Sequence, residues 1–152
     1  MGLKGKLITQ SEINCHGDIF HELFRHKPHH VASVIPDTVQ NCELHEGEFG
    51  SLGSVLSWNY THEGKEMVLK TKIEGIDEEK KLVTFNVTEG DVMELYKKFI
   101  VTMHIDTIGD DNHVVTWTFE YEKKYEEAPA PTSYIDLAIS VTKGIQDHHA
   151  NK

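Results

Sequence analysis

The chain has 152 residues, which is enough for one domain and too few for two independent hydrophobic cores. Its 25 acidic and 15 basic side chains give a formal net charge of −10 at pH 7. This balance argues against nucleic acid as a partner, because affinity for phosphate backbones comes from clustered Lys and Arg. A hydrophobic content of 38% and an aromatic content of 9% exclude a disordered chain. We therefore expect a single acidic, soluble domain over residues 1–152.

Several features predict a cytoplasmic protein. No run approaches the roughly 18 apolar residues that span a bilayer, so we expect no stable insertion into a membrane. The segment Met1–Lys6 lacks the apolar stretch of a signal peptide. Cys15 and Cys42 are too few for a disulfide framework and predict free thiols. No motif indicates a cofactor.

The beginning of the chain predicts a strand and two short helices. Leu3–Ile13 mixes apolar and polar residues without proline, as a strand does. From Asp18 the apolar residues take helical spacing, and Pro28 and Pro36 then bound a second short helix. The apolar residues of these helices are Phe20, Leu23 and Phe24, followed by Val31, Val34 and Ile35.

The middle of the chain predicts six consecutive strands, because apolar and polar residues alternate in six short runs separated by polar turns. Such turns are predicted at His62–Lys65, Asp77–Lys80 and Gly109–Asn112. The pattern predicts an antiparallel meander within an α+β fold. The six runs are Val39–His45, Ser54–Tyr60, Met67–Ile73, Val83–Val87, Phe99–Ile105 and Val115–Tyr121.

The end of the chain predicts a long amphipathic helix after a proline-containing linker, Glu126–Pro131. Ser133 followed by Asp136 resembles a capping box and places the helix N-cap at Ser133. One face of the helix is predicted to carry Ile135, Ala138, Ile139, Thr142, Ile145 and His149.

The meander needs an apolar partner for one of its faces, and the long helix is the only large element available. Two outcomes are open. The inward side chains pack on the helix as a solid core, or the curved sheet leaves a ligand pocket between itself and the helix. Alternation alone does not distinguish them. The inward residues are predicted to be Leu56, Trp58, Tyr60, Phe85, Phe99, Met103, Trp117 and Phe119.

Short motifs along the whole chain carry a resemblance to a known family. They are Gly2–Leu7, Arg25–Val31, Cys42–Gly50, Gly53–Val55, Trp58–Tyr60, His62–Lys65, Ile76–Glu79, Glu89–Asp91, Tyr96–Lys97 and Glu120–Lys123. Their order and spacing resemble the major latex protein (MLP-like) branch of the birch pollen allergen superfamily, also known as pathogenesis-related class ten. The resemblance implies a helix-grip fold. In that fold a seven-stranded curved antiparallel sheet wraps around a long C-terminal helix, with two short helices after the first strand.

The resemblance also implies a function. Members of this superfamily bind lipids, steroids, hormones and other plant metabolites in a cavity between sheet and helix. Latex-type members are associated with defence and stress responses. A carrier of a small hydrophobic or amphipathic ligand, lysophospholipids included, is therefore favoured. Two alternatives stay open: an isomerase or condensing enzyme acting on an alkaloid-type intermediate, and an interaction module whose surface changes with its ligand. The sequence defines no protein partner.

The candidate ligand-binding residues are apolar side chains of the short helices, the inward strand faces and the long helix. We expect some of them to be packed core. They are Phe20, Leu23, Val31, Val34, Leu56, Trp58, Tyr60, Met67, Leu69, Phe85, Phe99, Val101, Met103, Trp117, Phe119, Tyr134, Ala138, Val141 and Ile145.

Catalytic candidates are few. Tyr60 and Tyr134 are the candidate proton donors, although a single inward tyrosine more commonly orients a ligand. Glu89 and Asp91 lie at a strand end, and His104 is predicted to face away from the inward side. No Ser-His-Asp or Cys-His arrangement is asserted.

The glycine-rich loop Gly47–Gly53 resembles a phosphate-binding loop in its glycine content. A nucleotide-binding loop ends in Gly-Lys-Ser/Thr and is followed directly by a helix, whereas this loop joins two strands. Glu46 directly precedes the loop and Glu48 lies within it, and both carboxylates would repel phosphate. We expect its glycines, Gly47, Gly50 and Gly53, to form a stiff turn at one end of the pocket.

Eleven histidines are unusual for a chain of this length. Zinc needs three or four converging donors, and adjacent histidines on a helix point about 100° apart, so we predict no metal site. Solvated surface histidines are the simpler interpretation. The alternative is a pH effect, in which protonation in acid strengthens contact with anionic membranes. That effect concerns all eleven histidines, seven of which fall in two groups along the chain: His16, His21, His26, His29 and His30, and His148 and His149.

Overall fold

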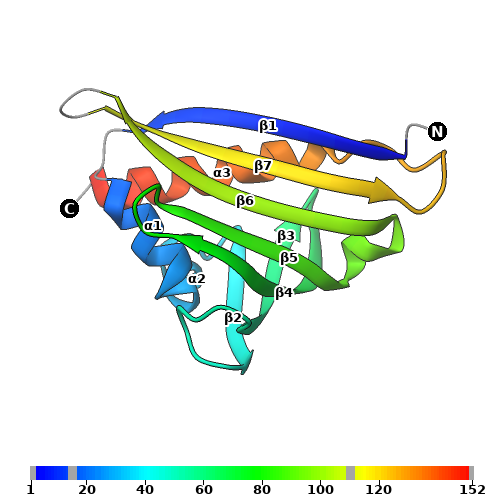
Figure 1. The fold of residues 1–152 in the computed structure, drawn as a ribbon, viewed down its shortest axis with the longest axis horizontal. Helices are drawn as coiled ribbons and strands as arrows, with labels where there is room; N and C mark the ends of the chain where they lie inside the picture. Colours follow the sequence, from blue (N-terminus) through cyan, green and yellow to red (C-terminus); the bar gives the residue numbers. More distant parts are fainter. Residues whose placement is uncertain (1–2, 14–16, 109–111, 151–152) are drawn as a thin grey trace.

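The computed structural model describes residues 3–13, 17–108 and 112–150. In this part of the chain, a curved antiparallel sheet of seven strands wraps around a long C-terminal helix (Figure 1). The predicted α+β helix-grip fold is therefore confirmed. The strands are β1 (Lys4–Ile13), β2 (Val39–Glu46), β3 (Val55–His62), β4 (Lys65–Asp77), β5 (Leu82–Gly90), β6 (Tyr96–Ile108) and β7 (Asn112–Lys123).

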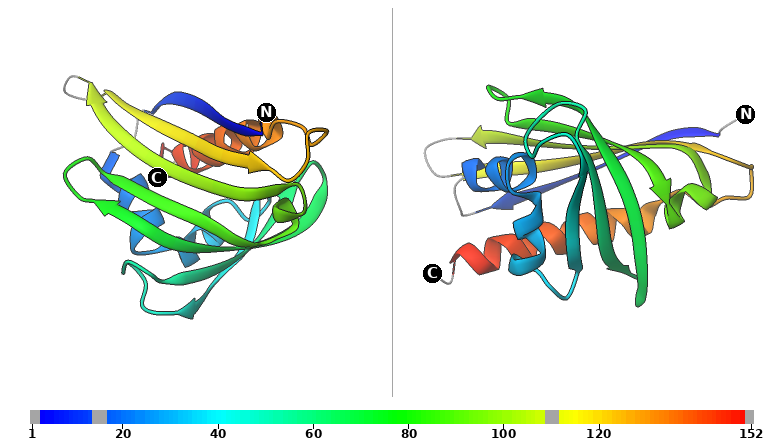
Figure 2. Two further views of the ribbon diagram at one scale, coloured as in Figure 1. Left: turned by 45° about the vertical axis from the view of Figure 1, so that its right-hand side comes forward. Right: turned by 90° about the horizontal axis from the view of Figure 1, so that it is seen from below.

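The sheet has the order β1-β7-β6-β5-β4-β3-β2, so strands β2 to β7 form the predicted meander and β1 adds to it beside β7. Phe119 of β7 lies opposite Leu7 of β1 on one side and Val101 of β6 on the other. Register shifts interrupt the β2–β3, β4–β5 and β6–β7 pairs. Irregularities of this kind bend strands and increase their twist. The resulting curl of the sheet around the helix is visible in Figure 2.

The helices occupy the concave side and one end of the sheet. The two predicted short helices are present as α1 (Gly17–Arg25) and α2 (Val31–Val34), with the 3₁₀ turn η1 (Pro28–His30) directly before α2. They lie near the C-terminal turns of the long helix, α3 (Thr132–Ala150) (Figures 1 and 2). A further 3₁₀ helix, η2 (Asp91–Glu94), joins β5 and β6 and is not predicted by the apolar pattern.

Helix α3 differs from the sequence prediction in its start and in its buried face. It begins at Thr132, so Ser133 lies inside the first turn rather than at the N-cap. Ile139, predicted to face inward, is 41% exposed. The helix instead turns Tyr134, Ala138 and other residues at spacings of three and four toward the sheet, which rotates Ile139 outward because successive residues are about 100° apart. The residues that α3 buries are Tyr134, Ala138, Val141, Thr142 and Ile145.

Some predictions fall on parts of the chain that the structure does not describe. They include Cys15, His16 and most of the predicted turn at Gly109–Asn112. Within the described ranges, none of the helices is both long enough and apolar enough to cross a membrane.

Candidate ligand-binding site

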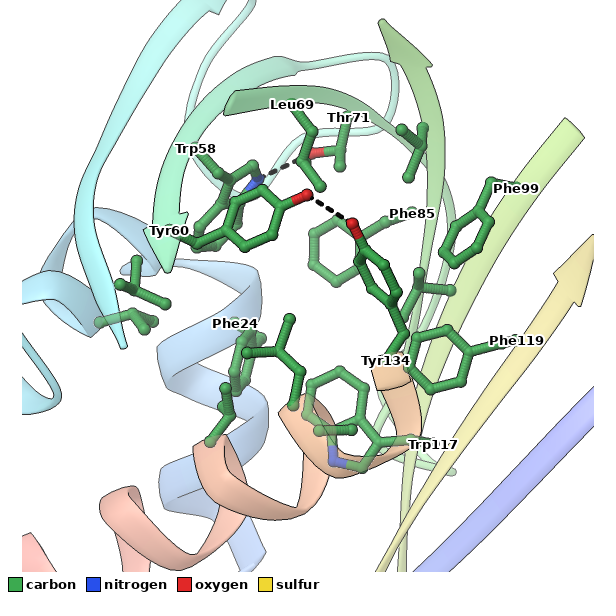
Figure 3. A pocket seen from close by; sticks show the side chains of 17 residues that line it. Phe24, Trp58, Tyr60, Leu69, Thr71, Phe85, Phe99, Trp117, Phe119 and Tyr134 are labelled. Carbon is green, nitrogen blue, oxygen red and sulfur yellow. Dashed lines mark hydrogen bonds between the residues drawn. The ribbon is translucent and has the colours of Figure 1, made fainter. Parts of the chain in front are cut away.

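An apolar cavity lies between the concave face of the sheet and helix α3 (Figure 3). It contains about 790 Å³ of space that protein atoms do not fill, part of it open to solvent. Its lining residues are Phe24, Val31, Val39, Trp58, Tyr60, Leu69, Thr71, Phe85, Val87, Phe99, Val101, Trp117, Phe119, Tyr134, Leu137, Ala138 and Val141.

Simple periodicities bring these residues together. On the strands the lining residues are two apart, as Trp58 and Tyr60 are on β3, because alternate side chains point to the same face. On α3 they follow the helical spacing of three and four. The short helices supply Phe24 and Val31. The ring of Phe24 packs edge-on against Trp117, with centroids 5.3 Å apart, and so closes the cavity beside α3.

Most of the predicted ligand-binding residues line this cavity. They come from the strands, from α2 and from α3, and Figure 3 shows many of them pointing into the same space. They are Val31, Trp58, Tyr60, Leu69, Phe85, Phe99, Val101, Trp117, Phe119, Tyr134, Ala138 and Val141.

Seven of the candidate residues are not among those that line the cavity. Five of them belong to the buried core: Phe20, Leu23, Leu56, Met103 and Ile145. Val34 and Met67 are only partly buried and pack against that core. Periodicity indicates which way a side chain points. It does not indicate how far along its strand or helix the cavity extends.

Five lining residues were not among the candidates: Phe24, Val39, Thr71, Val87 and Leu137. Phe24 lies one turn after Phe20, and Leu137 lies about one turn after Tyr134, so the helical spacing already contained the signal. Thr71 is polar, but it alternates in phase with Leu69 and therefore points to the same side of β4. Its role is to satisfy a buried donor.

The polar atoms of the two tryptophans are satisfied by threonine hydroxyls. The indole N–H of Trp58 donates to Thr71 Oγ1 at 2.9 Å. That of Trp117 donates to Thr142 Oγ1 at 2.8 Å, and this hydroxyl in turn donates to the carbonyl of Ala138. Buried N–H groups that are already paired do not compete for a ligand. Both rings are thereby fixed in orientation and present apolar surface to the cavity.

Tyr60 and Tyr134 form the polar feature of the cavity. Their hydroxyl oxygens are 2.7 Å apart, and both side chains are buried (Figure 3). Burial raises the pKa of Tyr60 to about 12. Burial, followed by the neighbouring Tyr60, raises the pKa of Tyr134 above its ordinary range. Both phenols are therefore neutral at neutral pH. One hydroxyl donates to the other, and the accepting hydroxyl keeps its own proton for a ligand.

The remaining catalytic candidates lie outside the cavity. His104 lies on β6 with Nε2 3.5 Å from Asp106 Oδ1, and it does not line the cavity, consistent with its predicted outward position. Asp91 Oδ2 accepts the backbone N–H of Val68 at 2.9 Å, which ties η2 to β4. Glu89 Oε2 lies 3.3 Å from Lys70 Nζ. Each of these contacts holds neighbouring strands or turns together.

The glycine-rich loop packs against the short helices and does not line the cavity. Gly47, Gly50 and Gly53 have φ angles of 81°, 84° and 85°, which a side chain disfavours. A Cβ on Gly50 would lie 2.6 Å from His26 Nδ1, and the ring of Phe49 packs on His29 with centroids 4.2 Å apart. The loop thus supports the elements that carry Phe24 and Val31 and contributes no cavity surface of its own.

Outside the cavity, neither the thiol of Cys42 nor a cluster of metal-binding side chains forms a reactive site in the described part of the chain. Cys42 is buried on β2 as a free thiol, and burial raises its pKa to about 12, which makes it a poor nucleophile. Among the residues that the structure describes, no group of three or more His, Cys, Asp or Glu side chains is arranged to hold a metal ion.

Fold and site together define a helix-grip protein of ligand-binding type, in which a curved sheet holds a long helix and leaves an apolar cavity beneath it. Residues 2–152 match the Pathogenesis-related protein Bet v 1 family. The chain belongs to this family.

Relatives with known names place the chain among the latex-type members. It is 44% identical over 143 residues to MLP-like protein 34 of Arabidopsis thaliana. The alignment covers 93% of this chain and 45% of that relative, so the chain spans less than half of the relative's length. The crystal structure of major latex-like protein 151 from Panax ginseng has a TM-score of 0.95 and 50% identity and covers 97% of this chain and 99% of that one.

A more distant structure shares the fold alone. Norcoclaurine synthase from Thalictrum flavum, in complex with dopamine and hydroxybenzaldehyde, has a TM-score of 0.72 and 18% identity. The likeness covers 95% of this chain and 88% of that one. At this identity the site residues do not transfer from one protein to the other.

Proposed function

We propose that the protein binds a small hydrophobic or amphipathic ligand in the cavity and carries or sequesters it. The observation that supports this most strongly is an apolar cavity whose lining holds a buried pair of tyrosine hydroxyls. Lipids including lysophospholipids, steroids, hormones and other plant metabolites are the ligand classes that fit. A role in plant defence or stress responses and a cytoplasmic location are parts of the same proposal, and the likeness to latex-type proteins supports the first of them.

The physical basis of binding is burial of apolar surface. Each Å² of ligand surface removed from water contributes about 25 cal/mol, before the cost of immobilising the ligand. The fixed rings of Trp58 and Trp117 lose little further freedom on binding, since their indole groups are already hydrogen-bonded. The Tyr60–Tyr134 pair supplies one hydrogen bond and so selects ligands with a hydroxyl or carbonyl group at the matching position.

The proposal is tested by displacing a neutral fluorescent probe with lysophospholipids, steroids, cytokinins, flavonoids and alkaloid precursors. Trp58→Ala is expected to lower the affinity for the ligand that displaces the probe, because it removes part of the cavity wall. Leu56→Ala is the matched control: it lies on the same strand, is fully buried and does not line the cavity. It should lower stability by about 2–5 kcal/mol and leave affinity unchanged in protein that remains folded. Equal affinity in both variants would remove Trp58 from the site.

A second candidate function is catalysis in the same cavity, as an isomerase or condensing enzyme on an alkaloid-type intermediate. The specific observation in its favour is the neutral Tyr60–Tyr134 pair, which can donate a proton to a bound substrate. If so, turnover of such an intermediate is lost in Tyr60→Phe or Tyr134→Phe. Turnover that survives both changes would exclude these residues as proton donors.

A further inference from the structure

A second hollow, the acidic groove, lies between the N-terminal half of α3 and the turn that joins β3 and β4. Three carboxylates line it, those of Asp37, Glu63 and Asp136, together with four serine and threonine side chains. No lysine or arginine is among the lining residues in the described part of the chain. The groove therefore presents hydrogen-bond acceptors and negative charge to solvent. In Figure 1 the turn between β3 and β4 reaches toward the orange N-terminal turns of α3.

His62 lies at the inner side of this groove with an unused hydrogen-bonding atom. The residue lines the groove, yet it is only 7% exposed. Its Nε2 is buried and has no hydrogen-bond partner among the described residues. The neighbouring Glu63 Oε1 is 3.8 Å away, beyond hydrogen-bonding distance. Buried polar atoms are nearly always paired in folded proteins, so an orphan at the edge of a hollow indicates a missing partner.

The groove and the apolar cavity share a wall. Leu137 of α3 lines both of them. The imidazole of His62 packs on the ring of Tyr134, a cavity residue, with centroids 4.3 Å apart and planes inclined by 39°. The His62–Tyr134 contact thus lies at the border where the apolar cavity adjoins the acidic, hydroxyl-rich groove.

We propose that the acidic groove binds the charged end of the cavity's ligand, and that this end is an ammonium group carrying N–H. The inference rests on the proposed function, because the apolar body of the ligand lies in the cavity. The three carboxylates attract a cation and repel a carboxylate or phosphate end. The orphan Nε2 of His62, in the tautomer with the proton on Nδ1, accepts one N–H of the ammonium group.

The test uses four octyl compounds that differ only in their polar end: octylammonium, octyltrimethylammonium, octanoate and neutral octyl glucoside. Each displaces a neutral fluorescent probe from the 152-residue chain at concentrations below micelle formation. Octylammonium is expected to bind most tightly, about tenfold tighter than octanoate, because the groove favours one sign of charge. Equal affinities of octylammonium and octanoate would overturn the inference.

Two substitutions separate local from overall charge. Glu63→Gln combined with Asp136→Asn removes two groove carboxylates. The affinity for octylammonium should fall by about tenfold, and the affinity for octyl glucoside should not change. Glu12→Gln combined with Asp147→Asn makes the same change in net charge at exposed positions outside the groove and should change nothing. An equal loss in both double variants would show that only the net charge of −10 matters, and would contradict the inference.

A third variant isolates the hydrogen bond. His62→Phe keeps a ring against Tyr134 and removes the hydrogen-bond acceptor. The affinity for octylammonium should fall by about fivefold, whereas the affinity for octyltrimethylammonium should not change, because that cation has no N–H to donate. Equal effects on both cations would exclude Nε2 as the acceptor. Failure of the inference is distinguishable from failure of the proposed function, because in the second case neither the probe nor octyl glucoside binds at all.

Discussion

At the scale of single residues, the Tyr60–Tyr134 pair sets the chemistry of the cavity. The two hydroxyls are hydrogen-bonded to each other in a largely apolar lining, and burial keeps both neutral. A neutral phenol donates a hydrogen bond and does not act as a base, which favours orientation of a ligand over proton abstraction.

Tyr134→Phe removes one hydroxyl and leaves that of Tyr60 buried without a partner. We expect the free energy of unfolding to fall by about 1–2 kcal/mol in urea titrations, because a buried unpaired polar group is costly. Affinity should fall for ligands with a hydroxyl or carbonyl group and stay unchanged for purely apolar ones. Tyr125→Phe, at an exposed position, is the control. A loss that is the same for both kinds of ligand would argue against an orienting role.

Stability should also depend on alkaline pH. The pKa of Tyr60 is about 12 in the folded protein against about 10 in the unfolded chain, so the folded state holds its proton longer. The stabilisation is complete below pH 10 and is lost as pH rises from about 10 to 12. Urea unfolding across this range should show the fall, and Tyr60→Phe should make it shallower. An identical slope in the variant would place the pH dependence elsewhere.

At the scale of elements, the strand ends hold the sheet in its curved shape. Gly90 ends β5 with a φ of 135°, and a Cβ there would lie 2.5 Å from the carbonyl oxygen of Val68 on β4. The close approach of β5 to β4 at this point therefore requires glycine. The carboxylate of Asp91 then accepts the backbone N–H of the same Val68, which ties η2 to β4.

Gly90→Ala is expected to lower the free energy of unfolding by about 2–4 kcal/mol, since it combines a disfavoured φ with a clash against backbone. Gly64→Ala is the matched control, because its φ is 77° but no atom lies within 4 Å of the added Cβ. It should cost about 1 kcal/mol, the conformational term alone. Equal losses, measured by urea unfolding, would mean that the close approach of the strands contributes nothing.

Element periodicity also explains how much the sequence could predict. Alternation along β3 correctly turned Trp58 and Tyr60 inward, because the strand period of two is a property of the backbone. It could not separate Trp58, which lines the cavity, from Leu56, which is packed core, since both point the same way. The depth of a cavity is set by long-range packing of sheet, short helices and α3. Position in the chain does not encode it locally.

The same limit applies to polar residues. Thr71 lines the cavity beside Leu69 and accepts the indole N–H of Trp58, a pairing that links β3 to β4. His62 looked like part of a turn, and only the fold brings it against Tyr134, which is far away in the sequence. Contacts of this kind depend on strand register and on where α3 docks.

At the scale of the whole molecule, the proposed function requires that a ligand binds in the space between the sheet and α3. Ala138 lines this space from α3, whereas the neighbouring Ile139 is 41% exposed and does not line it. Ala138→Phe therefore fills the cavity, and Ile139→Phe adds the same ring outside it.

The most direct measurement is titration of the protein and these two variants with a neutral fluorescent probe. We predict saturable one-to-one binding to the natural sequence and to Ile139→Phe, and weakening by at least about tenfold in Ala138→Phe that remains folded by circular dichroism. Equal binding in Ala138→Phe and Ile139→Phe, or none in the natural sequence, would contradict the claim that ligands bind beneath α3.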